Sequence, residues 1–137
     1  DIAIWRPSNG NWYIVESSTS FIVQVGWGET GDRPLMADFD GDGRTDLTAF
    51  RPGSNTWYIF NPFSSLYRTQ VFGEAGDIPV PGDYDGDGVF DVAVFRPGSN
   101  VWYRLNSSDG GFITHFVNGT TSSFNSVSPV PKAAQPE

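Results

Sequence analysis

Two short segments of the chain carry four aspartates each, at the same spacing. Residues 38–46 read Asp-Phe-Asp-Gly-Asp-Gly-Arg-Thr-Asp, and residues 83–91 read Asp-Tyr-Asp-Gly-Asp-Gly-Val-Phe-Asp. Carboxylates packed this closely repel one another unless a cation lies among them, and an all-oxygen ligand set favours a hard ion such as Ca²⁺. The sequence therefore predicts two calcium-binding loops, one in each segment.

The spacing within each loop explains how the carboxylates would converge. In a tightly curved loop, alternate residues point to one side, so the first, third and fifth positions gather around a common point. The two glycines of each loop allow backbone angles that residues with a Cβ resist. The alternative is a pair of exposed turns made of aspartate and glycine, but duplication of the whole pattern argues against it. An EF-hand does not fit, because its last carboxylate is a glutamate at position 12.

Both loops belong to a longer repeat with a period of 45 residues. Its landmarks are an aromatic residue before Arg-Pro and a Trp-Tyr pair, which start at Trp5, Phe50 and Phe95 and at Trp12, Trp57 and Trp102. Such a period predicts a solenoid, a propeller or another array whose units bury their faces against neighbours. With 16 glycines, 10 prolines, 15% aromatic residues and no helical periodicity, the units are predicted to be all-β.

Within each unit, alternating apolar residues and turn residues mark four short antiparallel strands, which is the pattern of a β-propeller blade. We therefore predict about three blades. Inner strands are expected at residues 34–38 and 79–83, so that each acidic loop joins the first strand of a blade to its second. The expected division is a first blade lacking its inner strand, two blades with calcium loops and a C-terminal strand or tail, at residues 1–33, 34–78, 79–123 and 124–137.

Three blades are too few to close a ring, since about four to eight are usual. Two alternatives stay open. The chain is either part of a longer propeller, or several copies assemble so that the tail of each completes the first blade of a neighbour. We favour the longer propeller, because the first unit begins at Asp1, which aligns with the last aspartate of each loop.

The acidic loops and the strands that follow them, Leu47-Thr48-Ala49-Phe50 and Val92-Ala93-Val94-Phe95, resemble the FG-GAP and VCBS-type repeats of integrin α-subunit propellers and bacterial surface proteins. The resemblance covers nearly residues 1–120. It implies that each loop binds calcium through side chains at positions 1, 3, 5 and 9 and through the backbone carbonyl at position 7. The implied ligands are Asp38, Asp40, Asp42, the Arg44 carbonyl and Asp46 in the first loop, and Asp83, Asp85, Asp87, the Val89 carbonyl and Asp91 in the second.

Charge and composition exclude several classes of function. The formal net charge is −8, which argues against nucleic acid as a partner. No run of 18 apolar residues is present, so no membrane span is expected. We also expect no enzyme activity, because the chain has one histidine and no cysteine and commits most of its clustered carboxylates to metal. That histidine, His115, is expected on a strand surface.

The expected function is a calcium-stabilised scaffold or adhesion module that binds a protein partner or its own larger assembly, including the remaining blades. Loops with dissociation constants of about 10⁻⁴ to 10⁻³ M fill outside the cell, so the expected location is extracellular or at the cell surface, with the periplasm as the alternative. The alternative function is a lectin-like propeller with sugar sites between blades. We expect the Trp-Tyr pairs to pack between blades instead, and Arg6, Arg51 and Arg96 to pair with aspartates or aromatic rings.

Overall fold

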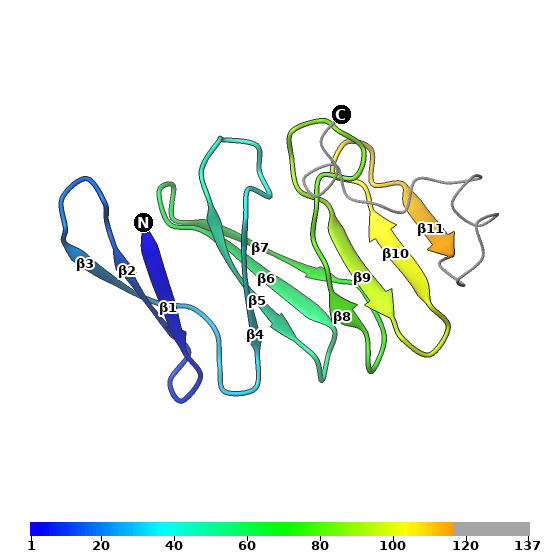
Figure 1. Ribbon diagram of the computed structural model, residues 1–137, viewed down its shortest axis with the longest axis horizontal. Coiled ribbons are helices and arrows are strands. Elements are labelled where there is room, and N and C mark those ends of the chain that lie inside the picture. Colours follow the sequence, from blue (N-terminus) through cyan, green and yellow to red (C-terminus); the bar gives the residue numbers. More distant parts are fainter. Residues whose placement is uncertain (117–137) are drawn as a thin grey trace.

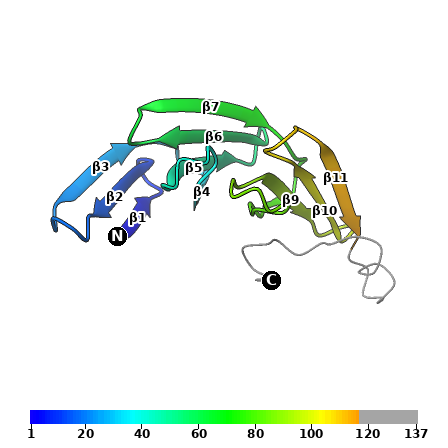
Figure 2. The ribbon, with the colours of Figure 1, turned by 90° about the horizontal axis from the view of Figure 1, so that it is seen from above.

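The computed structural model describes residues 1–116, which form three antiparallel β-sheets arranged in an arc (Figures 1 and 2). Sheet one contains β1 (Ile2–Arg6), β2 (Asn11–Val15) and β3 (Ile22–Gly26). Sheet two contains β4 (Arg33–Ala37), β5 (Asp46–Arg51), β6 (Thr56–Asn61) and β7 (Leu66–Val71). Sheet three contains β8 (Ile78–Pro79), β9 (Val92–Arg96), β10 (Val101–Leu105) and β11 (Phe112–Phe116).

Each strand pairs with the next one along the chain, so every sheet is a simple meander. Figure 2 shows β1, β4 and β9 toward the concave side of the arc and β3, β7 and β11 toward its convex side. No helix occurs among residues 1–116, and hence none that could cross a membrane. The all-β prediction is confirmed, and sheets of three and four strands are consistent with propeller blades. The expected tail at residues 124–137 lies outside the described residues.

The inner strand of sheet three is shorter than predicted. It was expected over residues 79–83, but β8 ends at Pro79, and pairing resumes only as an isolated bridge between Gly82 and Asp91. The cause is Pro81, which has no N–H to donate to the ladder. Sheet two carries Met36 at the equivalent position, and β4 is uninterrupted there.

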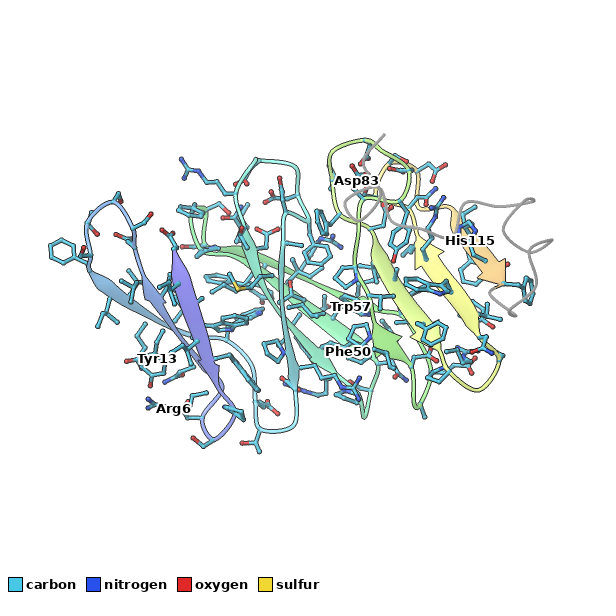
Figure 3. The ribbon with its side chains drawn as sticks, in the orientation of Figure 1. Arg6, Tyr13, Phe50, Trp57, Asp83 and His115 are labelled. Atoms are coloured by element: carbon cyan, nitrogen blue, oxygen red, sulfur yellow. The ribbon has the colours of Figure 1, made fainter. Side chains whose placement is uncertain are left out.

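Aromatic side chains fill the space between sheets two and three (Figure 3). Trp57 is 0% exposed, and its ring lies 5.3 Å from that of Phe50 and 6.3 Å from that of Phe39. Its indole Nε1 donates to the carbonyl of Phe72 at 3.1 Å, and Trp12 makes the same bond to Trp27 at 3.0 Å. Trp57 belongs to one buried cluster with Val92 and Val94 of sheet three, so packing between blades is confirmed for this residue. Trp12 is buried as well, and each of the two tryptophans satisfies its one polar atom internally.

The sheets are joined by two segments of similar sequence, residues 27–32 and 72–77, which we call the acidic linkers. Asp32 of the first linker accepts two hydrogen bonds of 2.9 Å from Arg51 of sheet two, and Glu29 lies 3.3 Å from the same guanidinium. The guanidinium carbon also lies 4.5 Å from the centre of the Tyr58 ring. The predicted pairing of this arginine with an aspartate and an aromatic ring is confirmed.

The second linker repeats this arrangement on sheet three. Asp77 accepts hydrogen bonds of 2.8 and 2.9 Å from Arg96, whose guanidinium lies 3.1 Å from Glu74 and 4.3 Å from the ring centre of Tyr103. Burial raises the pKa of the Asp77 carboxyl, whereas the hydrogen bonds from Arg96 and from the backbone N–H of Glu74 lower it. Together the bonds outweigh burial, so the pKa lies below its usual value. The carboxylate is therefore held ionised inside the fold.

His115 was expected on a strand surface, and that expectation is wrong. It does lie in β11, but its side chain is buried opposite Trp102 of β10. The reason is that directly opposed residues of antiparallel strands share a face, so His115 lies on the face that the tryptophan occupies. Burial lowers the pKa of the imidazole, and the nearby Arg104 adds to this effect, so the ring is neutral at pH 7.

Candidate metal centre

The first acidic loop connects β4 to β5 at one end of sheet two (Figure 1). Its backbone turns tightly enough to bring one carboxylate oxygen each of Asp38, Asp40 and Asp42 within 4.8 Å of one another. The prediction that the first, third and fifth side chains converge is therefore correct for this loop. Three ionised carboxylates at this distance form a concentrated negative site open to solvent.

Backbone N–H groups shape this cluster. The carboxylate of Asp38 accepts hydrogen bonds from the N–H groups of Gly41 at 2.6 Å and Gly43 at 2.8 Å. Both glycines have positive φ angles, of 81° and 82°, which residues with a Cβ rarely adopt. The glycines thus allow the chain to curl around the carboxylate of its own first residue.

The second acidic loop, between β8 and β9, repeats the geometry; Figure 3 labels its first residue, Asp83. Asp83, Asp85 and Asp87 each place a carboxylate oxygen within 4.8 Å of the other two. Asp83 again accepts from two glycines, Gly86 at 2.7 Å and Gly88 at 3.0 Å. The two loops are therefore structural as well as sequence repeats.

The last aspartate of the first loop is buried and is not one of the three clustered carboxylates. Asp46 is 1% exposed, and its Oδ2 accepts a hydrogen bond of 2.8 Å from the N–H of Phe39. Its Oδ1 is buried and has no hydrogen-bond partner among the described residues. Burial, helped by the three clustered carboxylates, raises the pKa of Asp46 to about 6. A buried carboxylate oxygen without a donor is costly, and a cation in the loop would satisfy it. The residues of this loop thus fit a cation.

The last aspartate of the second loop is fully bonded to protein. Asp91 accepts from the N–H of Tyr84 at 2.9 Å and from the N–H of Ser107 at 2.7 Å, although burial still raises the pKa of its carboxyl. The equivalent of Ser107 in sheet two is Pro62, which has no N–H to donate. One proline therefore explains why a carboxylate oxygen stays unpaired in the first loop and not in the second.

Side chains at the end of β6 and in the turn after β10 brace the two clusters, and they were not predicted from the sequence. In sheet two, the amide Nδ2 of Asn61 donates to Asp40 at 2.7 Å and to Asp42 at 2.8 Å, and this contact is the main reason that the pKa of Asp40 is lowered. In sheet three, hydroxyl groups take this part: Ser107 donates to Asp87 at 3.0 Å, and Ser108 donates to Asp85 at 2.6 Å. The repeat of an asparagine at positions 61 and 106 was visible in the sequence. It predicts a turn, however, and does not predict a hydrogen bond to an aspartate of the loop.

The two loops also contact each other. The N–H of Phe90 in the second loop donates to the carbonyl of Asp38 in the first at 2.8 Å, and the rings of Phe39 and Phe90 lie 6.4 Å apart. The backbone carbonyls of Arg44 and Val89 stay predicted ligands. Their own N–H groups donate to Asp42 and Asp87, at 2.7 and 2.8 Å, which fixes the peptide planes on their amino-terminal sides.

Comparison with known families agrees with this geometry. The model of the FG-GAP-like repeat matches residues 38–94, a stretch that begins at the first aspartate of the first loop and ends within β9. Neither the comparison with curated proteins nor that with solved structures gave a match. The matched stretch contains both acidic loops, whose aspartate clusters could hold a metal ion, and all of sheet two after its first strand. Residues 38–94 of this chain therefore belong to the FG-GAP-like repeat family.

Proposed function

We propose that the chain is a calcium-stabilised repeat module in which each acidic loop binds one Ca²⁺. The observation that carries the proposal is the buried Oδ1 of Asp46, which has no donor, in the same loop as three convergent carboxylates. The proposed ligands are the side chains at loop positions 1, 3, 5 and 9 and the carbonyl at position 7, which are Asp38, Asp40, Asp42, Arg44 and Asp46 and then Asp83, Asp85, Asp87, Val89 and Asp91.

The chemistry of the donors supports calcium over other cations. Each cluster offers carboxylate oxygens and no imidazole or thiolate, which disfavours zinc and copper. Magnesium demands a near-ideal octahedron and keeps several waters, so it uses only one or two carboxylates. Calcium accepts six to eight oxygens in a flexible arrangement, and three or four carboxylates with a carbonyl suit it better.

Binding would stabilise the fold because each loop joins the first two strands of its sheet. An ion that binds only the folded chain contributes about 1.4 kcal/mol when its concentration is ten times the dissociation constant. Sites of modest affinity reach that occupancy only where calcium is abundant, so we place the module outside the cell or at its surface. There its role is that of a scaffold or adhesion module that contacts a protein partner or further repeats.

The sugar-binding alternative is less well supported. Trp12 and Trp57 are buried and donate their indole N–H groups to backbone carbonyls, so neither ring is free to stack on a sugar. The contacts of the repeated arginines are with carboxylates and tyrosine rings of the fold itself. No described cluster of polar side chains beside an exposed tryptophan favours this function.

The test is to count bound calcium in the whole chain by equilibrium dialysis and elemental analysis, with thermal unfolding in calcium, magnesium and EDTA alongside. We expect two calcium ions per chain, a higher unfolding midpoint in calcium than in EDTA, and little effect of magnesium. Asp40→Asn and Asp85→Asn should each remove one ion. Asp109→Asn is the matched control, because it removes a charge outside the loops and keeps an acceptor for the N–H of Gly111. Equal midpoints in calcium and EDTA, or two ions retained by Asp40→Asn, would refute the proposal.

A further inference from the structure

The last aspartates of the two acidic loops differ by one hydrogen bond. In both, Oδ2 accepts a backbone N–H, at 2.8 Å in Asp46 and at 2.9 Å in Asp91. Oδ1 of Asp91 accepts a further N–H, from Ser107 at 2.7 Å, whereas Oδ1 of Asp46 has no partner among the described residues. The two side chains are 1% and 0% exposed, so unequal contact with solvent does not compensate for the missing bond.

One position of the 45-residue repeat supplies this bond. Ser107 and Pro62 are equivalent there, and a proline has no N–H to donate. Sheet one gives a third example, because the N–H of Ser17, 45 residues before Pro62, donates to Oδ1 of Asp1 at 2.8 Å. Asp1 in turn lies 45 residues before Asp46. The backbone at this position therefore reaches the last aspartate in each sheet where its residue has an N–H.

The other contacts of the two loops are similar. In each loop, the first aspartate accepts the N–H groups of two glycines, and the third and fifth aspartates accept hydrogen bonds from side chains at the end of β6 or in the turn after β10. Asp40 and Asp46 also line one cavity of about 200 Å³, so the side chain with the unpaired oxygen shares a space with a carboxylate of the cluster. The contact that distinguishes the two loops is the one at the last aspartate.

We propose that Pro62 makes the first loop the tighter of the two calcium sites and that Ser107 makes the second loop the weaker one. The inference rests on the proposed binding of calcium. In the ion-free chain, the unpaired Oδ1 of Asp46 raises the free energy of the folded state, and an ion that satisfies this oxygen removes the cost. Asp91 gains less from an ion, because its Oδ1 is already paired. A missing bond of this kind corresponds to a ratio of about 5 to 150 between two dissociation constants.

Unequal affinities give the chain a response in two stages. Both loops lie at the same end of their sheets (Figure 1), and the first loop fills at calcium concentrations that leave the second mostly empty. The second ion then acts where sheets two and three meet, since the N–H of Phe90 in the second loop donates to the carbonyl of Asp38 in the first. The first site is therefore the resident one, and the second responds to further calcium.

The experiment exchanges the N–H between the loops. Two single-site chains are prepared, Asp85→Asn to keep the first site and Asp40→Asn to keep the second, and their calcium affinities are measured by isothermal titration calorimetry. Pro62→Ala introduces an N–H beside the first site, and Ser107→Pro removes one beside the second. Ser107→Ala is the matched control, because it loses the same hydroxyl and keeps the N–H. Pro97→Ala controls for the loss of a proline elsewhere.

We expect the first site to bind calcium about tenfold more tightly than the second. Pro62→Ala should weaken the first site by about the same factor, and Pro97→Ala should leave it unchanged. Ser107→Pro should bind calcium more tightly at the second site than Ser107→Ala does. Equal affinities of the two sites, or an unchanged first site in Pro62→Ala, would overturn the inference. These two measurements decide the matter even where Ser107→Pro does not fold.

A second readout needs no calcium. In EDTA, Pro62→Ala should unfold at a higher temperature than Pro97→Ala, because both lose a proline and only the former gains a partner for Asp46. An equal or lower midpoint would contradict the inference as well. Two sites that bind calcium with equal affinity would refute this inference alone, whereas single-site chains that bind no calcium would refute the proposed function and the inference with it.

Discussion

Replacing Asp46 by asparagine should have opposite effects with and without calcium. In the ion-free chain, Asp46 is a buried carboxylate with a pKa of about 6, compared with an ordinary value of 3.8, and its Oδ1 has no donor. Asparagine removes the charge, keeps an acceptor for the N–H of Phe39 and offers its own N–H₂ to the neighbouring carboxylates. In calcium, the same substitution removes a charged ligand.

The size of the effect follows from the pKa. A difference of about two between the folded and unfolded pKa values corresponds to roughly 3 kcal/mol at neutral pH. Because the pKa of Asp46 is higher in the folded chain, the protonated carboxyl favours the folded state. This contribution to the free energy of unfolding is fully present below pH 3.8 and is lost as the pH rises through about 6. Asp46→Asn should therefore stabilise the ion-free chain by about 1–3 kcal/mol at pH 7.5 and by almost nothing at pH 4. In saturating calcium at pH 7.5, it should be less stable than the parent chain.

The assay is urea unfolding of both chains in EDTA and in calcium, with Asp91→Asn as the matched control. Asp91 already accepts from two N–H groups, so an asparagine there must turn its amide nitrogen toward one of these donors. A lost bond of this kind costs about 1–3 kcal/mol, which offsets the benefit of removing the charge. We expect no stabilisation from Asp91→Asn in EDTA. If Asp46→Asn destabilised the chain equally in EDTA and in calcium, the reasoning from the unpaired oxygen would be wrong.

Three further predictions concern the rest of the fold. The lowered pKa of Asp77 means that its pairing with Arg96 stabilises the chain above the unfolded pKa and is lost as the pH falls through the lower folded value, so the deficit of Asp77→Asn in urea unfolding should be present at pH 7 and shrink toward pH 2. Trp57→Ala should cost about 3–5 kcal/mol because the ring is fully buried, whereas Leu66→Ala, at a side chain 71% exposed, should stay within about 0.5 kcal/mol in the same assay. Gly10→Ala should lower the thermal midpoint strongly, because Gly10 has a φ of 67° and a Cβ there would meet a carbonyl oxygen of the first acidic linker at 2.0 Å; an unchanged midpoint would show that the linker moves freely.

Features set by local sequence were predictable. Alternation and turn residues act over a few positions, so the hairpin made by β5 and β6 could be located from residues 46–61 alone. The convergence of Asp38, Asp40 and Asp42 was also predictable, since it depends on the curvature that two glycines allow. The predicted length of the inner strand of sheet three was wrong, but the error was avoidable, because a proline such as Pro81 has no N–H for the strand ladder.

Features set by the register of one strand against another were not predictable. Asn61 reaches Asp40 only because the end of β6 lies next to the loop before β5, some twenty residues away in the chain. The unpaired oxygen of Asp46 has the same kind of origin, because it depends on which residue follows Asn61. Pro62 looked like an ordinary turn residue, and its effect on a buried carboxylate emerges only once the sheet is assembled.

Sheets two and three are tied together at both ends as well as through their core. At one end, Asp77 of the linker binds Arg96, and at the other, the N–H of Phe90 donates to the carbonyl of Asp38. The carbonyl proposed as a calcium ligand in the second loop, that of Val89, belongs to the same planar peptide unit as the N–H of Phe90. A cation that fixes this carbonyl therefore also fixes the donor to the first loop. Cation binding is in this way connected to the packing of one sheet on the next, and not only to the shape of a single loop.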